Sequence, residues 1–246
     1  MISRFANPQR FVRLARWLTP VFGFGALALL ATGLWLSLIA SPPDAEHGQT
    51  VRIMYVHVPA AWSAMAAYTS IAVASLVSFV WRHPLADTAA RNLALPGAAF
   101  TALALVTGAL WGKPDWGTYW QWDGRMTSVL ILLFIYIGYM AIWRVVADRK
   151  RAARLAAIVA MVGWINIPII KFSVEWWNSL HQSATVSSPG APGLAPEFLT
   201  PLLVMAGGYT LLLGWLTLRG MLGEIATARA ARRPAPAASV TIEAMP

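Results

Sequence analysis

The sequence contains no cysteine among its 246 residues. The chain therefore forms no disulfide, offers no thiolate to a metal ion and has no C-x-x-C-H motif for covalent attachment of a prosthetic group. It also lacks the G-x-x-x-x-G-K-[ST] loop with which many proteins bind and hydrolyse ATP. Thiol chemistry and P-loop ATP hydrolysis are both excluded for this chain.

Charged residues are also scarce. They make up 12% of the chain and apolar residues 58%, whereas soluble domains have about 25% and about 45–50%. Runs of about 20 apolar residues are long enough to cross a bilayer as helices. The pattern predicts an all-α, polytopic membrane helix bundle with six transmembrane helices, at residues 20–40, 60–81, 93–111, 127–145, 153–170 and 199–219.

Two of these spans have alternative interpretations. The fifth is short and contains Asn166 and Pro168, so a five-span protein is the alternative, although neighbouring helices can satisfy an interrupted backbone. The first span follows a basic segment and imitates a secretory signal, but its apolar core is longer than the roughly 7–15 residues of a signal peptide. We interpret it as a retained membrane anchor. The basic residues before it are Arg4, Arg10, Arg13 and Arg16.

Basic residues are distributed unevenly among the loops. The amino-terminal segment, the second and fourth loops and the carboxyl-terminal segment hold 15 of the 19 Lys and Arg residues. Because cytoplasmic loops of membrane proteins are enriched in Lys and Arg, this asymmetry predicts that both termini are cytoplasmic. The net charge of +9 then reflects orientation in the membrane and not binding to nucleic acid.

Residues 1–233 are predicted to form one membrane domain. The segment 234–246 lacks charge density and helical periodicity, which predicts a disordered cytoplasmic tail. The densest basic cluster, Arg149, Lys150 and Arg151, lies between the fourth and fifth spans. Such a cluster can contact anionic membrane lipid or an acidic partner, and lipid is the simpler interpretation.

Three segments then face outward, at residues 41–59, 112–126 and 171–198. His57 lies in the first and His181 in the third, each beside aromatic residues at the mouth of a span. His47 lies among polar residues and is expected to be a solvated loop histidine. The middle segment begins at the stretch WGKPDWGTYWQWD, whose Gly and Pro residues predict a shaped loop.

One surface thus carries two histidines and a tryptophan-rich segment. A six-coordinate haem needs two axial imidazoles and flat apolar surroundings. The pattern therefore favours non-covalently bound haem b, with His57 and His181 as axial ligands of the iron. Zinc is the alternative metal, but it needs about four ligands and leaves the tryptophans unexplained. Taken singly, either histidine is more often an interfacial hydrogen-bonding residue than a ligand.

The tryptophans have an alternative of their own, the aromatic belt found at membrane interfaces. A belt places aromatic residues around both rims of a protein. Here seven of the 13 tryptophans lie in or beside the outward segments, and four of them share residues 111–122. A belt accounts for the tryptophans elsewhere in the chain but not for this cluster.

Asp123 and Arg125 follow directly after the tryptophans. An Arg side chain matches a carboxylate with two parallel hydrogen bonds, so Arg125 is a candidate partner for a haem propionate and Asp123 a candidate to orient it. A plain surface Asp–Arg pair is an equally good interpretation of these two residues alone.

The sequence W-G-T-Y-W-Q-W-D from Trp116 to Asp123 resembles the WGxxWxWD signature of the haem-handling proteins of cytochrome c maturation. The segments VHVPAAW around His57 and WWNSLHQ around His181 resemble the two histidine segments of the CcmC family within that group. The resemblance extends over all six spans and their order. It implies that His57 and His181 are the axial ligands and that a haem-holding loop is formed by Trp116, Gly117, Trp120, Trp122 and Asp123.

The resemblance further implies a bacterial inner-membrane protein that binds haem at the periplasmic face and delivers it to the haem chaperone CcmE. The family works in a complex with an ATPase subunit, CcmA, and two further membrane subunits, CcmB and CcmD. This is binding and transfer, so an enzyme is not expected. The absence of an ATP site in this chain agrees with reliance on another subunit to drive release.

Two other functions are alternatives. One is a transporter that moves haem across the bilayer, although no two spans show the matched interruptions of an inverted-repeat carrier. The other is a membrane electron carrier with bound b-type haem. Such carriers generally hold haem between spans with histidines inside the helices, whereas both candidate histidines here lie at helix mouths.

Overall fold

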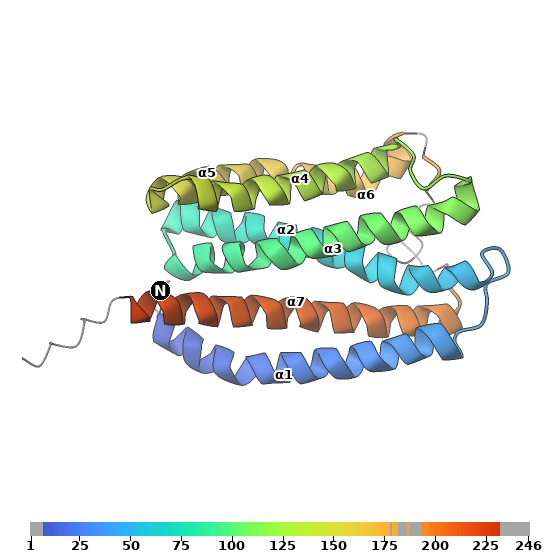
Figure 1. Ribbon diagram of the computed structural model, residues 1–246, viewed down its shortest axis with the longest axis horizontal. Helices are drawn as coiled ribbons and strands as arrows, with labels where there is room; N and C mark the ends of the chain where they lie inside the picture. The colour runs from blue at the N-terminus through green and yellow to red at the C-terminus, as the bar shows by residue number, and fades with distance from the viewer. Residues whose placement is uncertain (1–6, 178, 182–185, 187–192, 232–246) are drawn as a thin grey trace, which may run out of the picture.

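A computed structural model describes residues 7–177, 179–181, 186 and 193–231. These residues form helices joined by short connections (Figure 1). The predicted tail at 234–246 lies outside the described residues. The elements are α1 (Pro8–Trp35), the π-helix η2 (Leu36–Ala40), the 3₁₀-helix η3 (Gln49–Ile53), α2 (Met54–Trp81), α3 (Pro84–Trp116), α4 (Gly124–Val145), α5 (Arg149–Gly163), α6 (Asn166–Trp176) and α7 (Pro196–Ala230).

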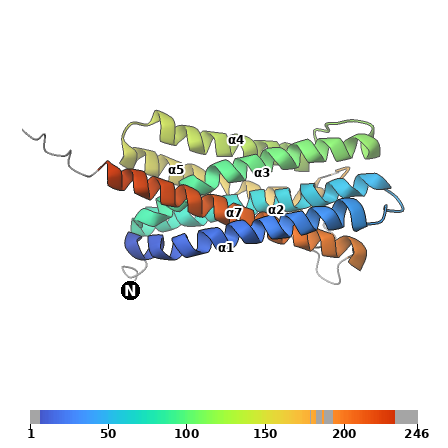
Figure 2. The same cartoon turned by 60° about the horizontal axis from the view of Figure 1, so that its bottom comes forward.

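Among the described residues, six segments are long and apolar enough to cross a membrane, which confirms the predicted all-α architecture. Each apolar range read from the sequence lies inside one of them. The helices run alongside one another (Figures 1 and 2), so the connections gather at two ends. We call the end that carries residues 41–53, 117–123 and 177–181 the Trp-rich end. The opposite end, where α1 begins and α7 ends, is the terminal end.

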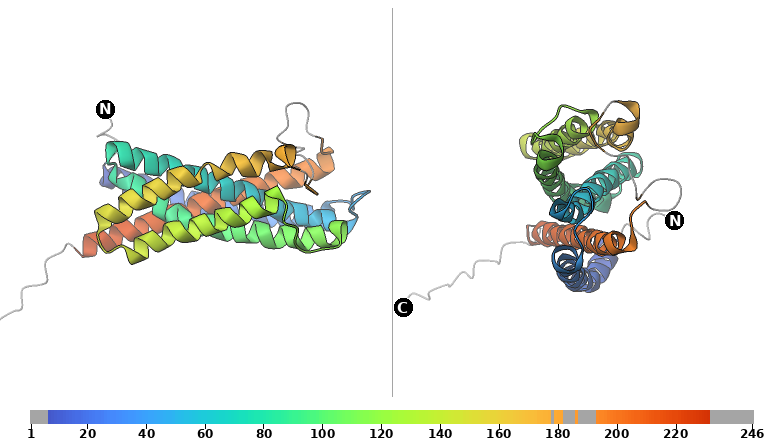
Figure 3. Two further views of the ribbon diagram at one scale, coloured as in Figure 1. Left: turned by 90° about the horizontal axis from the view of Figure 1, so that it is seen from above. Right: turned by 90° about the vertical axis from the view of Figure 1, so that its right-hand side faces the viewer.

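The helices form stacked layers (Figure 3). Helix α1 packs on α7, α7 on α2 and α3, and α4 and α5 cover the other side of that central pair. Helices α2 and α3 pack extensively against each other, and both bury small residues, including Ala60, Ala64, Ala67, Ala94 and Ala104. Small residues at helix contacts are typical of membrane proteins, where close packing of backbones replaces the hydrophobic effect between helices.

Buried tyrosine hydroxyl groups join helix α2 to helices α4 and α5. The Tyr136 hydroxyl in α4 donates to the carbonyl of Ala64 in α2 at 2.7 Å. The Tyr68 hydroxyl in α2 donates to the carbonyl of Val159 in α5 at 3.2 Å. The two tyrosine rings also meet edge to face, 5.1 Å apart. Both tyrosine hydroxyls are therefore satisfied inside the bundle, as a span in contact with hydrocarbon requires.

The fifth span is divided at Trp164 and Ile165, between α5 and α6. Pro168 explains the division, because its nitrogen has no hydrogen to donate and its ring crowds the preceding turn. The Asn166 amide donates to the carbonyl of Ser128 in α4 at 2.8 Å. This contact fixes the broken point to the neighbouring helix. The span is retained despite the interruption, so the five-span alternative is wrong.

The expectation that residues 112–126 form one loop is wrong in part. Helix α3 continues to Trp116, through Gly112 and Pro114, and only 117–123 lie between helices. A Cβ atom at Gly112 would lie 2.6 Å from the ring of Trp116. Glycine there lets that indole fold back along its own helix. Trp111 and Trp116 are therefore held by helical backbone, and the loop itself is short.

Candidate functional site

The candidate site at the Trp-rich end combines residues from four segments. His57 lies in the first turns of α2, and Trp111 and Trp116 lie at the end of α3. The loop 117–123 follows, and His181 lies in the connection between α6 and α7. Most of the residues singled out in the sequence are therefore gathered at one end of the bundle (Figure 1).

His57 is held against α3 by its Nδ1 atom. This atom lies 3.0 Å from the carbonyl oxygen of Ala104 and 3.1 Å from the hydroxyl of Thr107. A carbonyl only accepts, and the Thr107 hydroxyl already donates to Leu103, so Nδ1 carries the hydrogen. The Nε2 atom of His57 then keeps its lone pair, which is the form of imidazole that binds a metal.

The close approach of His57 to α3 depends on Gly108. A Cβ atom at position 108 would lie 2.9 Å from the Cε1 atom of His57, which is shorter than real contacts of this kind. The edge of the ring also meets Trp111, with centroids 6.0 Å apart. Helix α3 thus fixes His57 through its backbone and one indole.

His181 is held by a carboxylate. Its Nδ1 atom lies 2.6 Å from Asp123 Oδ2, and the exposed fractions of the two side chains are 15% and 4%. The Ser179 hydroxyl donates to the same Asp123 oxygen at 2.5 Å. Ser179 Oγ in turn accepts the backbone N–H of His181 at 3.1 Å. A short cycle of hydrogen bonds therefore sets the position of the imidazole.

Asp123 also begins helix α4. Its Oδ1 atom accepts the backbone N–H of Met126 at 2.8 Å, the usual bond of an aspartate at a helix amino terminus. One carboxylate therefore caps a helix with one oxygen and holds His181 with the other. Asp123 thus forms hydrogen bonds with Met126, Ser179 and His181, and its charge also acts on Arg125.

The charges in this cluster favour an ionised aspartate beside a neutral histidine. Burial acts to raise the pKa of Asp123, but the bonds from Ser179 and Met126 and the nearby His181 together lower it. Burial lowers the pKa of His181, and this outweighs the attraction of Asp123. A neutral imidazole that donates through Nδ1 keeps the lone pair of Nε2, as at His57.

Trp116 contacts His181 as Trp111 contacts His57. The rings of Trp116 and His181 lie 4.6 Å apart at 65°. Because Trp111 and Trp116 belong to the same helix end, α3 links the two histidines. Gly117 ends this helix in a left-handed conformation with φ of 75°, which glycine adopts without steric cost. The glycine of the WGxxW pattern therefore turns the chain away immediately after Trp116.

Trp120 and Trp122 form the rest of the aromatic cluster. Their rings meet edge to face, 5.3 Å apart. Trp122 is 75% exposed, whereas Trp120 is partly buried. The indole nitrogens of Trp111 and Trp120 are buried and have no hydrogen-bond partner among the described residues. A buried donor without an acceptor is costly, so these two groups are suited to an acceptor supplied by a ligand.

Arg125 lies in the first turn of α4, partly buried. It interacts electrostatically with Asp123 and Glu175, and its charge also acts on His57 and His181. The predicted site residues His57, His181 and Arg125 therefore lie close enough to interact electrostatically with one another. A cavity of about 400 Å³ is lined by Asp123 and Ser179, the hydrogen-bond partners of His181, and by Trp122.

Two features were missed in the sequence. Ser179 had no signal beyond its place two residues before His181. The expectation for His47 is wrong, because its side chain is only 15% exposed and its Nδ1 atom lies 3.2 Å from Asp115 Oδ2. The ring of His47 also meets the edge of Trp111 at 5.8 Å. His47 is therefore packed against the aromatic cluster, between Trp111 and Asp115.

A comparison with protein families agrees with this arrangement. The family model described as CcmC, heme exporter protein C, matches residues 1–235. The chain belongs to the heme exporter protein C family. This family is one of exporters and not of catalytic enzymes, and the six apolar spans agree with a multi-pass membrane protein.

Several relatives in the family cover most of the chain. The heme exporter protein C of Bradyrhizobium diazoefficiens is 54% identical over 220 residues, which is 89% of this chain and 83% of the relative. That of Escherichia coli K12 is 41% identical over 220 residues, 89% of each chain. A protein of Marchantia polymorpha named as a putative cytochrome c biosynthesis ccmC-like mitochondrial protein is 43% identical over 186 residues, 76% of this chain and 78% of that protein.

Proposed function

We propose that the chain binds haem at its Trp-rich end and delivers it for the maturation of c-type cytochromes. The observation that carries this proposal is the shared state of the two histidines. His57 and His181 each donate through Nδ1 to a fixed acceptor, which leaves both Nε2 atoms as ligands at the same end of the bundle. Family membership supports the same cargo.

The residues present fit a haem molecule as cargo. His57 and His181 supply two axial imidazoles, the ligand set of a six-coordinate b-type haem. Trp116, Trp120 and Trp122 offer indole surfaces to the macrocycle. The propionates are acceptors for the buried indole N–H groups of Trp111 and Trp120 and for the guanidinium of Arg125. Gly117 supports this set by turning the chain between Trp116 and Trp120.

The partly open position of the site suits transfer better than permanent storage. Trp122 is 75% exposed at the surface, beside the cavity that Asp123 and Ser179 line. Trp122 lies outside the membrane-spanning segments and packs against Trp120, so its exposed ring is available to a partner at the Trp-rich end. We infer that Trp122 contacts the acceptor, the haem chaperone CcmE, and that the chain works in a complex with CcmA, CcmB and CcmD.

We infer the orientation of the chain in the membrane from the distribution of its charges. The segments of the Trp-rich end carry four Lys and Arg residues, whereas the other 15 belong to the terminal end and its flanking segments. By the positive-inside rule the terminal end is cytoplasmic and the Trp-rich end periplasmic, in the inner membrane of a bacterium. Haem bound there is on the side where c-type cytochromes acquire it.

The axial assignment is tested by spectroscopy of the purified full chain loaded with haem. We expect the absorption and electron paramagnetic resonance spectra of bis-histidine iron in the wild type. His57→Ala and His181→Ala should each abolish this spectrum, and added imidazole should restore it by filling the vacated position. His83→Ala, at the terminal end, is the matched control. Unchanged spectra in both His57 and His181 variants would overturn the assignment.

Delivery is tested separately with Trp122→Ala. Because Trp122 is exposed, its removal should leave folding and the bis-histidine spectrum intact while slowing transfer of haem to purified CcmE. Trp17→Ala is the control, since Trp17 is 76% exposed on α1, away from the site. Transfer at the wild-type rate in the Trp122 variant would show that this residue belongs only to the aromatic belt.

A further inference from the structure

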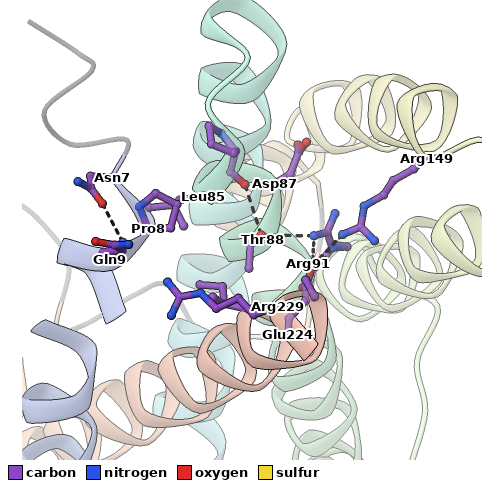
Figure 4. Close-up of a pocket in the computed structure, with 13 residues that line it drawn as sticks. Asn7, Pro8, Gln9, Leu85, Asp87, Thr88, Arg91, Arg149, Glu224 and Arg229 are labelled. Carbon is purple, nitrogen blue, oxygen red and sulfur yellow. Dashed lines mark hydrogen bonds and ion pairs between the residues drawn. The ribbon is translucent and has the colours of Figure 1, made fainter. Parts of the chain in front are cut away.

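A second cavity lies at the terminal end of the bundle, opposite the candidate site (Figure 4). It has a volume of about 700 Å³ and lies between the start of α1, the start of α3, the first residue of α5 and the end of α7. Its wall contains apolar side chains, including Pro8, Leu85 and Ile225, together with charged ones. The cavity is therefore amphipathic and opens at the edge of the membrane-spanning region.

Three arginines and two carboxylates line this cavity, a positive excess of one charge. Glu224 is already satisfied, because Arg91 pairs with it, Asn92 donates to it at 2.9 Å and Arg149 donates to it at 2.9 Å. Arg91 is further fixed by the ring of Trp143, 4.4 Å from its guanidinium carbon. Arg91 and Arg149 share this one carboxylate, so together they exceed the charge of Glu224 by one positive charge.

Arg229 is the second source of surplus charge. It is exposed near the end of α7 and forms no ion pair with any residue that the structure describes. In Figure 4 its guanidinium extends toward the side where Gln9 lies, while Arg149 approaches Arg91 and Glu224 from the other side. Asp87 supplies the one remaining negative charge. The two arginines thus flank the cavity without a common protein carboxylate between them.

We propose that this cavity binds the head group of an anionic phospholipid, with Arg149 and Arg229 contacting its phosphate. A phosphodiester carries a single negative charge, which matches the surplus of the lining. Basic pockets between spans at the membrane surface are typical sites for acidic lipid head groups. Helix α1, whose first residues line the cavity, exposes the apolar side chains of Leu14 and Val21 further along its membrane-spanning length.

The amphipathic lining favours a lipid over a soluble anion. Free phosphate would use the arginines but would leave the Pro8, Leu85 and Ile225 surfaces in contact with water. A lipid covers both kinds of surface at once. The proposal is independent of haem binding, because none of its residues belongs to the Trp-rich end.

The experiment uses the purified full chain in detergent after removal of bound lipid. The unfolding temperature is measured during titration with phosphatidylglycerol, with phosphatidylcholine and with inorganic phosphate. We expect saturable stabilisation by phosphatidylglycerol only. Arg149→Gln and Arg229→Gln should each weaken its binding about fivefold, since each arginine near a membrane contributes about one such factor. Arg151→Gln and Arg154→Gln remove equal charge at the same rim, outside the cavity, and are the controls.

The possible results separate the proposal from its competitors. Equal stabilisation by phosphatidylcholine would overturn the role of head-group charge. Equal weakening in the control variants would assign the effect to overall charge and not to the cavity. Stabilisation by inorganic phosphate that blocks the lipid effect would assign the cavity to a soluble anion. Arg229→Gln breaks no ion pair among the described residues, so a folded variant is available for every comparison.

Discussion

The two candidate ligands are held in different ways. His57 lies within helix α2, and its Nδ1 atom donates to a neutral backbone carbonyl of α3. His181 lies outside the helices, and its Nδ1 atom donates to the carboxylate of Asp123. The first imidazole is positioned by packing of two long helices, and the second by a local cycle of hydrogen bonds with Asp123 and Ser179.

Because of this difference, the placement of each imidazole and its strength as an electron donor to a metal depend on different contacts. A carboxylate partner makes an imidazole a stronger donor to a metal than a carbonyl partner does. His181 is therefore the more basic of the two candidate ligands, although its position depends on two side chains. His57 is the weaker donor, but two helices fix its position. Changes at the carboxylate should act on the strength and tautomer of His181, whereas changes at the α2–α3 contact should act on the placement of His57.

The largest effect short of removing a ligand is expected for Asp123→Asn. Asparagine is also a good helix cap, so its oxygen can keep the bond to Met126 while its NH₂ group faces His181. An NH₂ group cannot accept from Nδ1, which moves the histidine hydrogen to Nε2 and removes the ligand lone pair. We expect haem affinity to fall by about 10–100-fold, measured by titration and by loss of the bis-histidine spectrum.

Asp148→Asn is the matched control for this prediction. Asp148 caps α5 through the N–H of Arg151 at 2.7 Å, so the same substitution changes a helix cap far from the histidines. Unfolding measurements on both variants separate the cap from the ligand. A normal spectrum and affinity in the Asp123 variant would show that His181 does not depend on the carboxylate.

A smaller effect is expected on the other ligand from Gly108→Ala. The new methyl group would lie 2.9 Å from Cε1 of His57, and overpacking of this kind costs about 1–3 kcal/mol. The ring relieves the clash by moving, so haem affinity should fall by about tenfold. Gly138→Ala, in α4, meets no atom within 4 Å and should leave haem affinity unchanged. Equal affinity in the two variants would show that α3 does not position His57.

Hydropathy predicted the number and type of the spans but not their ends. Helix α1 begins at Pro8, before three arginines, and α7 continues to Ala230, beyond Glu224. Both extensions reach past the hydrocarbon, where a helix no longer needs apolar side chains and hydropathy no longer reports it. The fifth span was the least certain in the sequence, and it is the one that breaks, because Pro168 removes a backbone donor there.

The location of the candidate residues at one end of the bundle was predictable from the sequence, but the hydrogen bonds among them were not. Counting crossings placed His57, the tryptophans and His181 on one side, and the structure gathers them at one end. The bond between Asp123 and His181 joins residues 58 positions apart, and no local pattern encodes it. His47 was misjudged for the same reason, since its polar neighbours in sequence gave no indication of its contacts with Trp111 and Asp115.

The smallest effect in the comparison is expected for Ser179→Ala. The substitution removes the hydroxyl that donates to Asp123 and accepts from the backbone of His181, but it leaves the Asp123–His181 bond in place. A hydrogen bond of this kind contributes about 0.5–1.5 kcal/mol, so haem affinity should fall about fivefold with the bis-histidine spectrum retained. Ser70→Ala, which removes an exposed hydroxyl in α2, is the control. A loss as large as that of Asp123→Asn would mean that Ser179 is required to keep the carboxylate facing the imidazole, and an unchanged affinity would mean that Met126 alone holds Asp123 in place.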